Sequence, residues 1–125
     1  MNEWLDDFKM AVGFLTRLPV PHADAAGANF ARAYRLFPVV GGLIGLVTGL
    51  LCLGLRQAGV PDPAAAALAL GAGALLTGAL HEDGVADVAD GFGGGRDVEA
   101  KLAIMRDSRI GSYGVIALLV SFATK

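Results

Sequence analysis

The chain has 125 residues, of which 54% are hydrophobic and only 18% are charged, and its formal net charge is −2. Soluble domains normally have about a quarter of their residues charged, so the composition argues against a soluble protein. The slightly acidic balance argues against nucleic acid as a partner, because a phosphate backbone requires a basic face. The single cysteine, Cys52, excludes an internal disulfide and a cysteine-based metal site.

The first expected element is an amphipathic helix from about Asn2 to Leu18. Its apolar residues recur at helical spacing and its charged residues fall elsewhere on the helical wheel. The apolar set is Trp4, Leu5, Phe8, Val12 and Leu15, and the charged set is Asp6, Asp7 and Lys9. Because it carries too many charges to span a bilayer, we expect this helix to lie at a membrane interface. Pro19 and Pro21 end it, and a polar, alanine-rich loop follows to about Ala31.

Two uncharged runs follow, Leu36 to Leu55 and Pro63 to Leu80, separated by a short turn. A transmembrane helix needs roughly 20 apolar residues, so the runs predict a transmembrane hairpin. Gly41, Gly45 and Gly49 are spaced for close helix packing. A third apolar run, Ile110 to Thr124, is short for a crossing and predicts the start of a third span. The predicted fold is an all-α, polytopic membrane helical bundle forming a single membrane domain over residues 1–125.

The positive charges beside the apolar runs predict the orientation of this hairpin. Four lie before the first run, one lies in the turn and four lie after the second run: Lys9, Arg17, Arg32, Arg35; Arg56; Arg96, Lys101, Arg106, Arg109. Positively charged flanks favour the cytoplasmic side, so both ends of the hairpin are expected there.

The stretch from His81 to Gly95, HEDGVADVADGFGGG, carries the clearest chemistry. If the second helix continues into it, Asp83, Asp87 and Asp90 fall within about 60° of one another on one helical face. Carboxylates so close together favour a hard divalent cation, and Mg²⁺ is the usual ion beside phosphates. The alternative is a solvated acidic helix end, which the cost of acids beside a membrane span disfavours. The glycines after Asp90 either end the helix or, starting with Gly91, leave bare backbone for a phosphate substrate.

A basic cluster follows a short predicted helix, Val98 to about Asp107, for which Asp97 is the expected N-cap. Val98, Leu102 and Met105 are its expected buried stripe. Arg106, Ser108 and Arg109 then precede the third apolar run, where a helix N-terminus favours anions and arginine binds phosphate. Asp107 is a further metal ligand or an ion-pair partner of an arginine. Arg17 is a separate basic residue on the same predicted side. Simple anchoring at the interface is the alternative for all three arginines.

Four stretches occur in an order typical of one enzyme family. They are residues 14–21 (FLTRLPVP), 37–41 (FPVVG), 81–91 (HEDGVADVADG) and 104–114 (IMRDSRIGSYG). In these stretches the chain resembles cobalamin 5′-phosphate synthase, also called adenosylcobinamide-GDP ribazoletransferase. The last two motifs are long and specific. Where the family commonly has leucine after the histidine, this chain has Glu82, which adds an acid and removes none of the aspartates.

The resemblance implies a multi-pass, Mg²⁺-dependent phosphotransferase of the prokaryotic inner membrane. The family joins GDP-activated adenosylcobinamide to α-ribazole or its 5′-phosphate, and GMP leaves. Asp83, Asp87 and Asp90 would be catalytic and would hold the metal with Asp107. The substrate-binding residues would be Arg17, Gly91, Arg106, Ser108 and Arg109. Since the family's chains are longer, the resemblance covers their N-terminal half, and we expect this chain alone to bind metal without turning over substrate.

Two other functions stay open at this point. The chain could be a cation channel or carrier subunit with an aspartate-lined path, or a helical scaffold with an incidental acidic surface. The layout of glycines followed by arginines favours the enzyme. The sequence leaves open which aspartate is the base, which form of ribazole is the acceptor, and the oligomeric state, a homo-oligomer included.

Overall fold

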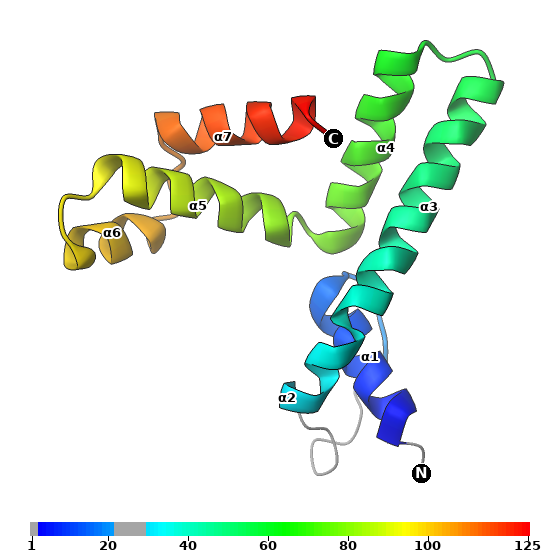
Figure 1. Ribbon diagram of the computed structural model, residues 1–125, viewed down its shortest axis with the longest axis horizontal. Coiled ribbons are helices and arrows are strands. Elements are labelled where there is room, and N and C mark those ends of the chain that lie inside the picture. Colours follow the sequence, from blue (N-terminus) through cyan, green and yellow to red (C-terminus); the bar gives the residue numbers. More distant parts are fainter. Residues whose placement is uncertain (1–2, 22–29) are drawn as a thin grey trace. The chain divides into compact units, whose positions relative to one another are not determined.

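The structure is a computed structural model that describes residues 3–21 and 30–125 (Figure 1). The regular elements in these ranges are all helices, which confirms the predicted all-α class. The contacts divide the chain into two compact units, Met1–Gly78 and Ala79–Lys125, and each is described by itself. The single membrane domain stays a prediction. Most of the expected loop before Ala31, residues 22–29, lies outside the described residues.

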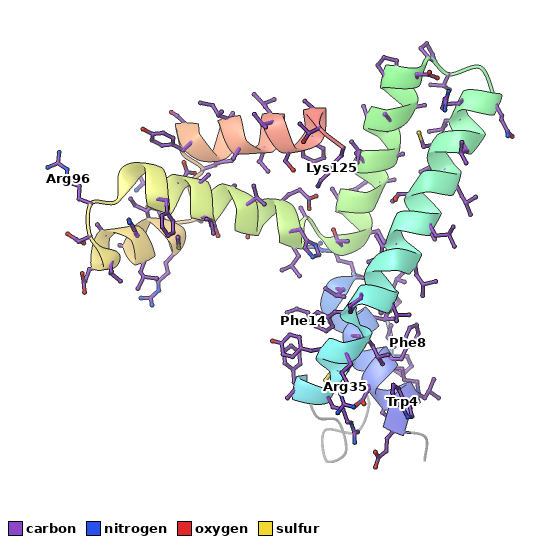
Figure 2. The ribbon with its side chains drawn as sticks, viewed as in Figure 1. Trp4, Phe8, Phe14, Arg35, Arg96 and Lys125 are labelled. Carbon is purple, nitrogen blue, oxygen red and sulfur yellow. The ribbon has the colours of Figure 1, made fainter. Side chains whose placement is uncertain are left out.

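The first unit begins with α1, Glu3–Leu15, which confirms the first predicted helix but ends before Leu18. Ala11 and Leu15 are buried against Val40, and Phe8 packs beside them. Trp4, labelled with Phe8 in Figure 2, is exposed, as an interfacial residue would be. Asp7 differs from the expectation for the polar face of α1. It is buried, and its charge is compensated by Arg32, whose Nε lies 2.7 Å from its Oδ2.

The first apolar run forms the longest helical stretch of the chain's described part. Helix α2 (Phe30–Ala33), the 3-10 turn η1 (Tyr34–Leu36) and α3 (Phe37–Gln57) follow one another without a break. Together they make a stretch of 28 residues that is long and apolar enough to cross a membrane, and little of its apolar surface is buried. Pro38 lies in the first turn of α3, where its missing N–H is not needed.

The second apolar run forms α4, Asp62–Thr77, which packs against α3. A Cβ at Gly73 would lie 3.0 Å from Cγ2 of Thr48, so this glycine allows the two helices to approach. By contrast, a Cβ at Gly41, Gly45 or Gly49 would meet nothing within 4 Å among the residues described. Helix packing by these three glycines therefore stays a prediction.

The predicted continuation of the second apolar helix into the acidic segment is wrong. Gly78 (φ 67°) and Ala79 (φ 58°) both adopt the left-handed region, which ends α4 at Thr77. Glycine adopts this region freely, whereas a residue with a Cβ loses about 1–2 kcal/mol there. A new helix, α5, begins at Leu80 and runs to Gly94. The acidic motif therefore lies on a helix of its own.

The second unit consists of α5, α6 (Val98–Met105) and α7 (Ser112–Ala123), and α5 packs against both of the others (Figure 1). The turn from α5 into α6 carries Arg96, labelled in Figure 2. The predicted N-cap is confirmed, since Asp97 Oδ1 accepts a 2.7 Å hydrogen bond from the Ala100 N–H. Helix α7 confirms that the third apolar run begins as a helix, but it is shorter than a span.

The predicted contact face of α6 is only partly correct. Val98 is 65% exposed and Leu102 is also exposed. The residues of α6 that come close to α5 are Lys101, Ile104 and Met105, which lie over the glycines Gly91, Gly94 and Gly95. These glycines do not end α5 early, because the helix runs on to Gly94. Their missing side chains let α6 approach, and the glycines therefore select the face of α6 that packs.

Candidate functional site in the second unit

Two of the three motif aspartates, Asp83 and Asp87, line the same cleft. Asp83 and Asp87 are one helical turn apart, the spacing that places two side chains side by side. Asp83 is exposed and Asp87 is half-buried. Neither carboxylate has a hydrogen-bond or ion-pair partner within residues 3–21 and 30–125. Two like charges that face open space in this way have oxygens available for a cation.

The opposite wall of this cleft is the end of α6 and the loop that leads into α7. The cleft has a volume of about 350 Å³. Its lining residues are Asp83, Ala86 and Asp87 from α5 and Met105, Arg106, Asp107, Ser108, Arg109 and Ile110 from the other wall. The structure thus brings the predicted phosphate-binding residues of the loop to the two free carboxylates. An anion in this cleft would meet arginine on one side and would need a cation on the other.

Asp107 is paired inside the loop itself. Its Oδ2 accepts a 2.7 Å bond from Arg109 Nη2, and its Oδ1 accepts 3.0 Å bonds from Arg109 Nε and from the Arg109 backbone N–H. The side-chain hydrogen bond from Arg109 is the main cause that lowers the pKa of Asp107 to about 2, and the same pairing raises the pKa of Arg109. Of the two interpretations of Asp107, the structure gives the ion pair.

Asp90 contacts the start of α7 and does not line the cleft of Asp83 and Asp87. It is only 8% exposed. Its Oδ2 accepts a 2.7 Å bond from the Gly111 N–H, and its Oδ1 accepts a 2.8 Å bond from the Gly114 N–H. Hydrogen bonds to a charged group contribute about 1.5–3 kcal/mol each. Both oxygens of the buried carboxylate are therefore occupied by backbone amides.

The two glycines of α7 are explained by this carboxylate. A Cβ on Gly111 would lie 2.5 Å from Asp90 Oδ1, and a Cβ on Gly114 would overlap the same carboxylate and lie 3.1 Å from the Ala86 carbonyl oxygen. Gly111 is the N-cap of α7 and has no side chain to cap the helix. Asp90 supplies from α5 the acceptor that an N-cap side chain normally gives.

The predicted three-aspartate cluster is not assembled in this part of the chain. Within residues 3–21 and 30–125, no three histidine, cysteine, aspartate or glutamate side chains are placed to hold one metal ion. Asp83 and Asp87 lie in one cleft, while Asp90 and Asp107 have their own partners. Two carboxylates still suit Mg²⁺, which proteins commonly hold through one or two carboxylates together with substrate phosphates. Metal binding stays a prediction.

The predicted substrate residues fall into different places. Arg106, Ser108 and Arg109 line the cleft, and all three are exposed. Gly91 differs, because it is buried and an added Cβ would lie 2.7 Å from Cε of Met105. Its missing side chain makes room for α6, and the Met105 side chain of α6 covers its backbone. Gly91 does not line the cleft, and its role toward a substrate stays a prediction.

Arg17 belongs to the first unit. Its backbone N–H donates a 2.8 Å bond to the Leu76 carbonyl, and its side chain lies over Gly78, where a Cβ would come within 2.5 Å of Nε. Arg17 is exposed and anchors the end of α1 to the end of α4. Its role toward a substrate stays a prediction.

Sequence reasoning missed two contacts of the second unit. One is the capping of α7 by Asp90, for which a glycine at the N-cap position and another three residues later were the available signal. The other joins Glu82 at the start of α5 to Lys125, with 3.3 Å between Oε1 and Nζ. In the sequence, Glu82 is identified only as an added acid in the motif, and no spacing rule relates two positions so distant in sequence.

Comparison with known proteins identifies the family of the chain. The chain matches the family model described as cobalamin-5-phosphate synthase over residues 7–125. It is 52% identical over its whole length to a Rhizobium etli protein and 45% identical to a Sinorhizobium protein, both named adenosylcobinamide-GDP ribazoletransferase. A protein of the same name from Shewanella amazonensis is 48% identical over 97% of the chain. The chain spans about half the length of these relatives, 49%, 48% and 46% respectively.

No solved structure matches the chain. The resemblance noted from the motifs is confirmed by the family match, and it covers the N-terminal half of the relatives. Neither the channel nor the scaffold interpretation gains support from these relatives.

Proposed function

Because the chain belongs to the cobalamin-5-phosphate synthase family, we propose that it provides the phosphate-handling part of an adenosylcobinamide-GDP ribazoletransferase of cobalamin biosynthesis. The observation that carries the proposal is the cleft in which Asp83 and Asp87 face Arg106, Ser108 and Arg109. Unpaired carboxylates opposite arginines are the groups that a transfer between phosphate esters requires, because negative charge must be both held and neutralised.

The proposed reaction moves the cobinamide phosphate from a diphosphate to an alcohol. A hydroxyl oxygen of α-ribazole, or of its 5′-phosphate, forms a bond to the phosphorus attached to cobinamide. The bond from that phosphorus to the bridging oxygen breaks, and GMP leaves with that oxygen. Arg106 and Arg109 would hold the phosphates in line with the attacking hydroxyl, which is the larger part of catalysis in such reactions. Asp87 or Asp83 would accept the hydroxyl proton.

Asp83 and Asp87 are also the residues that would hold Mg²⁺. The ion would neutralise charge on the diphosphate. What supports this assignment is that these two carboxylates are one turn apart and have no partner in the described chain. Only one of them needs to accept a proton, so the other can be committed to the ion. A role for Asp107 in the metal site would require Arg109 to release it.

We place the chain in the inner membrane of a prokaryote, with the first unit in the bilayer. The support is the helical stretch Phe30–Gln57, which has the length and hydropathy of a span and buries little of its surface. Leu46 is exposed near its middle and Val98 on α6 is exposed to a similar extent. If α3 faces lipid and α6 does not, Leu46→Asp should cost about 3 kcal/mol of insertion free energy. Val98→Asp should change little, and equal tolerance of both in an insertion assay would contradict the placement.

The activity is tested on the full-length protein in nanodiscs, with adenosylcobinamide-GDP, α-ribazole and Mg²⁺, by following GMP release. Asp87→Asn should lower kcat by at least 100-fold, because it removes either the base or a metal ligand. The matched control is Glu99→Gln, which removes the same charge from an exposed position of α6 outside the cleft. Equal activity of the two variants would overturn the proposed site, and absence of GMP release from the wild type would overturn the function.

A further inference from the structure

We propose that Asp90 is a positioning residue, which holds the loop Arg106–Ile110 in the cleft by capping α7, and that it is not a metal ligand. The inference rests on the proposed function, because it assigns a part within that site. The three motif aspartates share a helical face, and their chemistry alone makes them equivalent. Their surroundings differ, and the difference separates Asp90 from Asp83 and Asp87.

Two backbone amides hold the Asp90 carboxylate. Its oxygens accept the Gly111 N–H at 2.7 Å and the Gly114 N–H at 2.8 Å, and the side chain is almost fully buried. A metal ion at Asp90 would have to share these two oxygens with the amides and reach a side chain that is only 8% exposed. Asp83 and Asp87 have no hydrogen-bond partner among the described residues that a metal ion would compete with.

Gly111, which Asp90 anchors, lies next to the loop that lines the cleft. Gly111 follows Ile110 directly, and the preceding Arg109 and Asp107 form the ion pair that lines the cleft. The loop leaves α6 at Arg106 and is held at its other end by Asp90. A second cleft of about 410 Å³ brings Asp90, Asp107 and Arg109 to one surface. Loosening Gly111 therefore moves Arg109 relative to Asp83 and Asp87.

The hydrogen bonds to Asp90 also restrict which residues can stand at the start of α7. Glycine is needed at both donor positions, since a Cβ at either would collide with the carboxylate. An open surface site for an ion would impose no such requirement on α7. Through Asp90 and the two glycines, α5 fixes the start of α7 and the loop before it.

The test compares Asp90→Asn with Asp87→Asn and Glu99→Gln in the full-length protein, using Mn²⁺ binding, amide exchange and steady-state kinetics. For Asp90→Asn we expect Mn²⁺ affinity within twofold of the wild type. Exchange of the Gly111 and Gly114 amides should become at least tenfold faster. The KM for the GDP-activated substrate should rise about tenfold, with a smaller change in kcat. Loss of folded protein alone would lower kcat and leave KM unchanged. In an Arg109→Gln background the KM effect should largely disappear.

A loss of Mn²⁺ affinity in Asp90→Asn would contradict the inference. If Asp90→Asn weakens Mn²⁺ at least tenfold, as Asp87→Asn is expected to, while the two glycine amides keep their protection, Asp90 is a ligand and the inference is wrong. If the wild type binds no Mn²⁺, the metal part of the proposed function fails. The inference is then decided by amide exchange and KM alone. If Asp90→Asn leaves both unchanged, the inference is wrong. Gly114→Ala serves as a second variant, because it disturbs the same contact and leaves the carboxylate intact.

Discussion

The described chain buries two carboxylates, Asp7 in the first unit and Asp90 in the second, and satisfies them in different ways. Asp7 is paired with the guanidinium of Arg32, whose Nε and Nη2 lie 2.7 and 3.2 Å from its oxygens. Asp90 has no cation beside it among the described residues and is held by two backbone amides at the start of a helix. An ion pair depends on two side chains. A capping carboxylate depends on the absence of side chains at its donors.

The two carboxylates therefore differ in how well their surroundings tolerate substitution. Arg32 also contacts Glu3 at 2.7 Å, so it keeps one acidic partner if Asp7 or Glu3 is substituted. The amides of Gly111 and Gly114 have no second acceptor among the side chains described. Substitution at Asp90 should therefore lower the free energy of unfolding more than substitution at Asp7. The following predictions test this comparison.

The largest effect is expected from Gly114→Ala. Its Cβ would overlap the Asp90 carboxylate and crowd the Ala86 carbonyl, which is backbone and cannot rotate away. We expect a loss of about 3 kcal/mol in the free energy of unfolding, from overpacking and from the lost hydrogen bonds. Denaturation in detergent measures it. Gly84→Ala is the control, because its Cβ would meet nothing within 4 Å and should stabilise the helix by up to about 1 kcal/mol.

Asp90→Asn should have the next largest effect, a loss of about 2 kcal/mol. The amide keeps one oxygen as an acceptor, but its NH₂ group faces a backbone N–H that then has no partner. Denaturation of this variant beside Glu99→Gln separates the loss of the cap from the loss of a charge. A loss no greater than that of the control would mean that the backbone bonds contribute little.

Asp7→Asn should be less harmful than Asp90→Asn. The amide oxygen of the variant still accepts from Arg32, and Arg32 retains Glu3. The double variant Glu3→Gln and Asp7→Asn removes both acids and should then cost clearly more than the sum of the single changes. Additive effects in this double-mutant cycle would show that Glu3 does not compensate.

The smallest effect concerns Asp107, whose partner Arg109 is 88% exposed at its side chain. Arg109→Gln should raise the pKa of Asp107 from about 2 towards its ordinary value of 3.8. Because the folded-state pKa is lowered, any stability from this pair is present above pH 3.8 and is lost as the pH falls through about 2. Carbon-13 titration of the carboxyl group measures the shift, and an unchanged pKa would show that the pair does not persist in solution.

The sequence by itself determined the helical class, the family and most helix positions, because these follow from local rules. The uncharged run predicts α3, Asp97 predicts the start of α6, and the motif from His81 to Gly91 places the acids on one helical face. Such features depend on residues a few positions apart, where helical periodicity and capping chemistry apply.

Only the tertiary structure decided which acid does what. Asp90 differs from Asp83 and Asp87 through donors 21 and 24 residues further along the chain. The same holds for α6, whose contact face is set by the glycines of α5 and so left Val98 and Leu102 exposed. The break at Gly78 and Ala79 was also missed, because an alanine in the left-handed region opposes its own preference. Local patterns specify where a side chain sits on its helix, whereas its partner depends on which helices pack together.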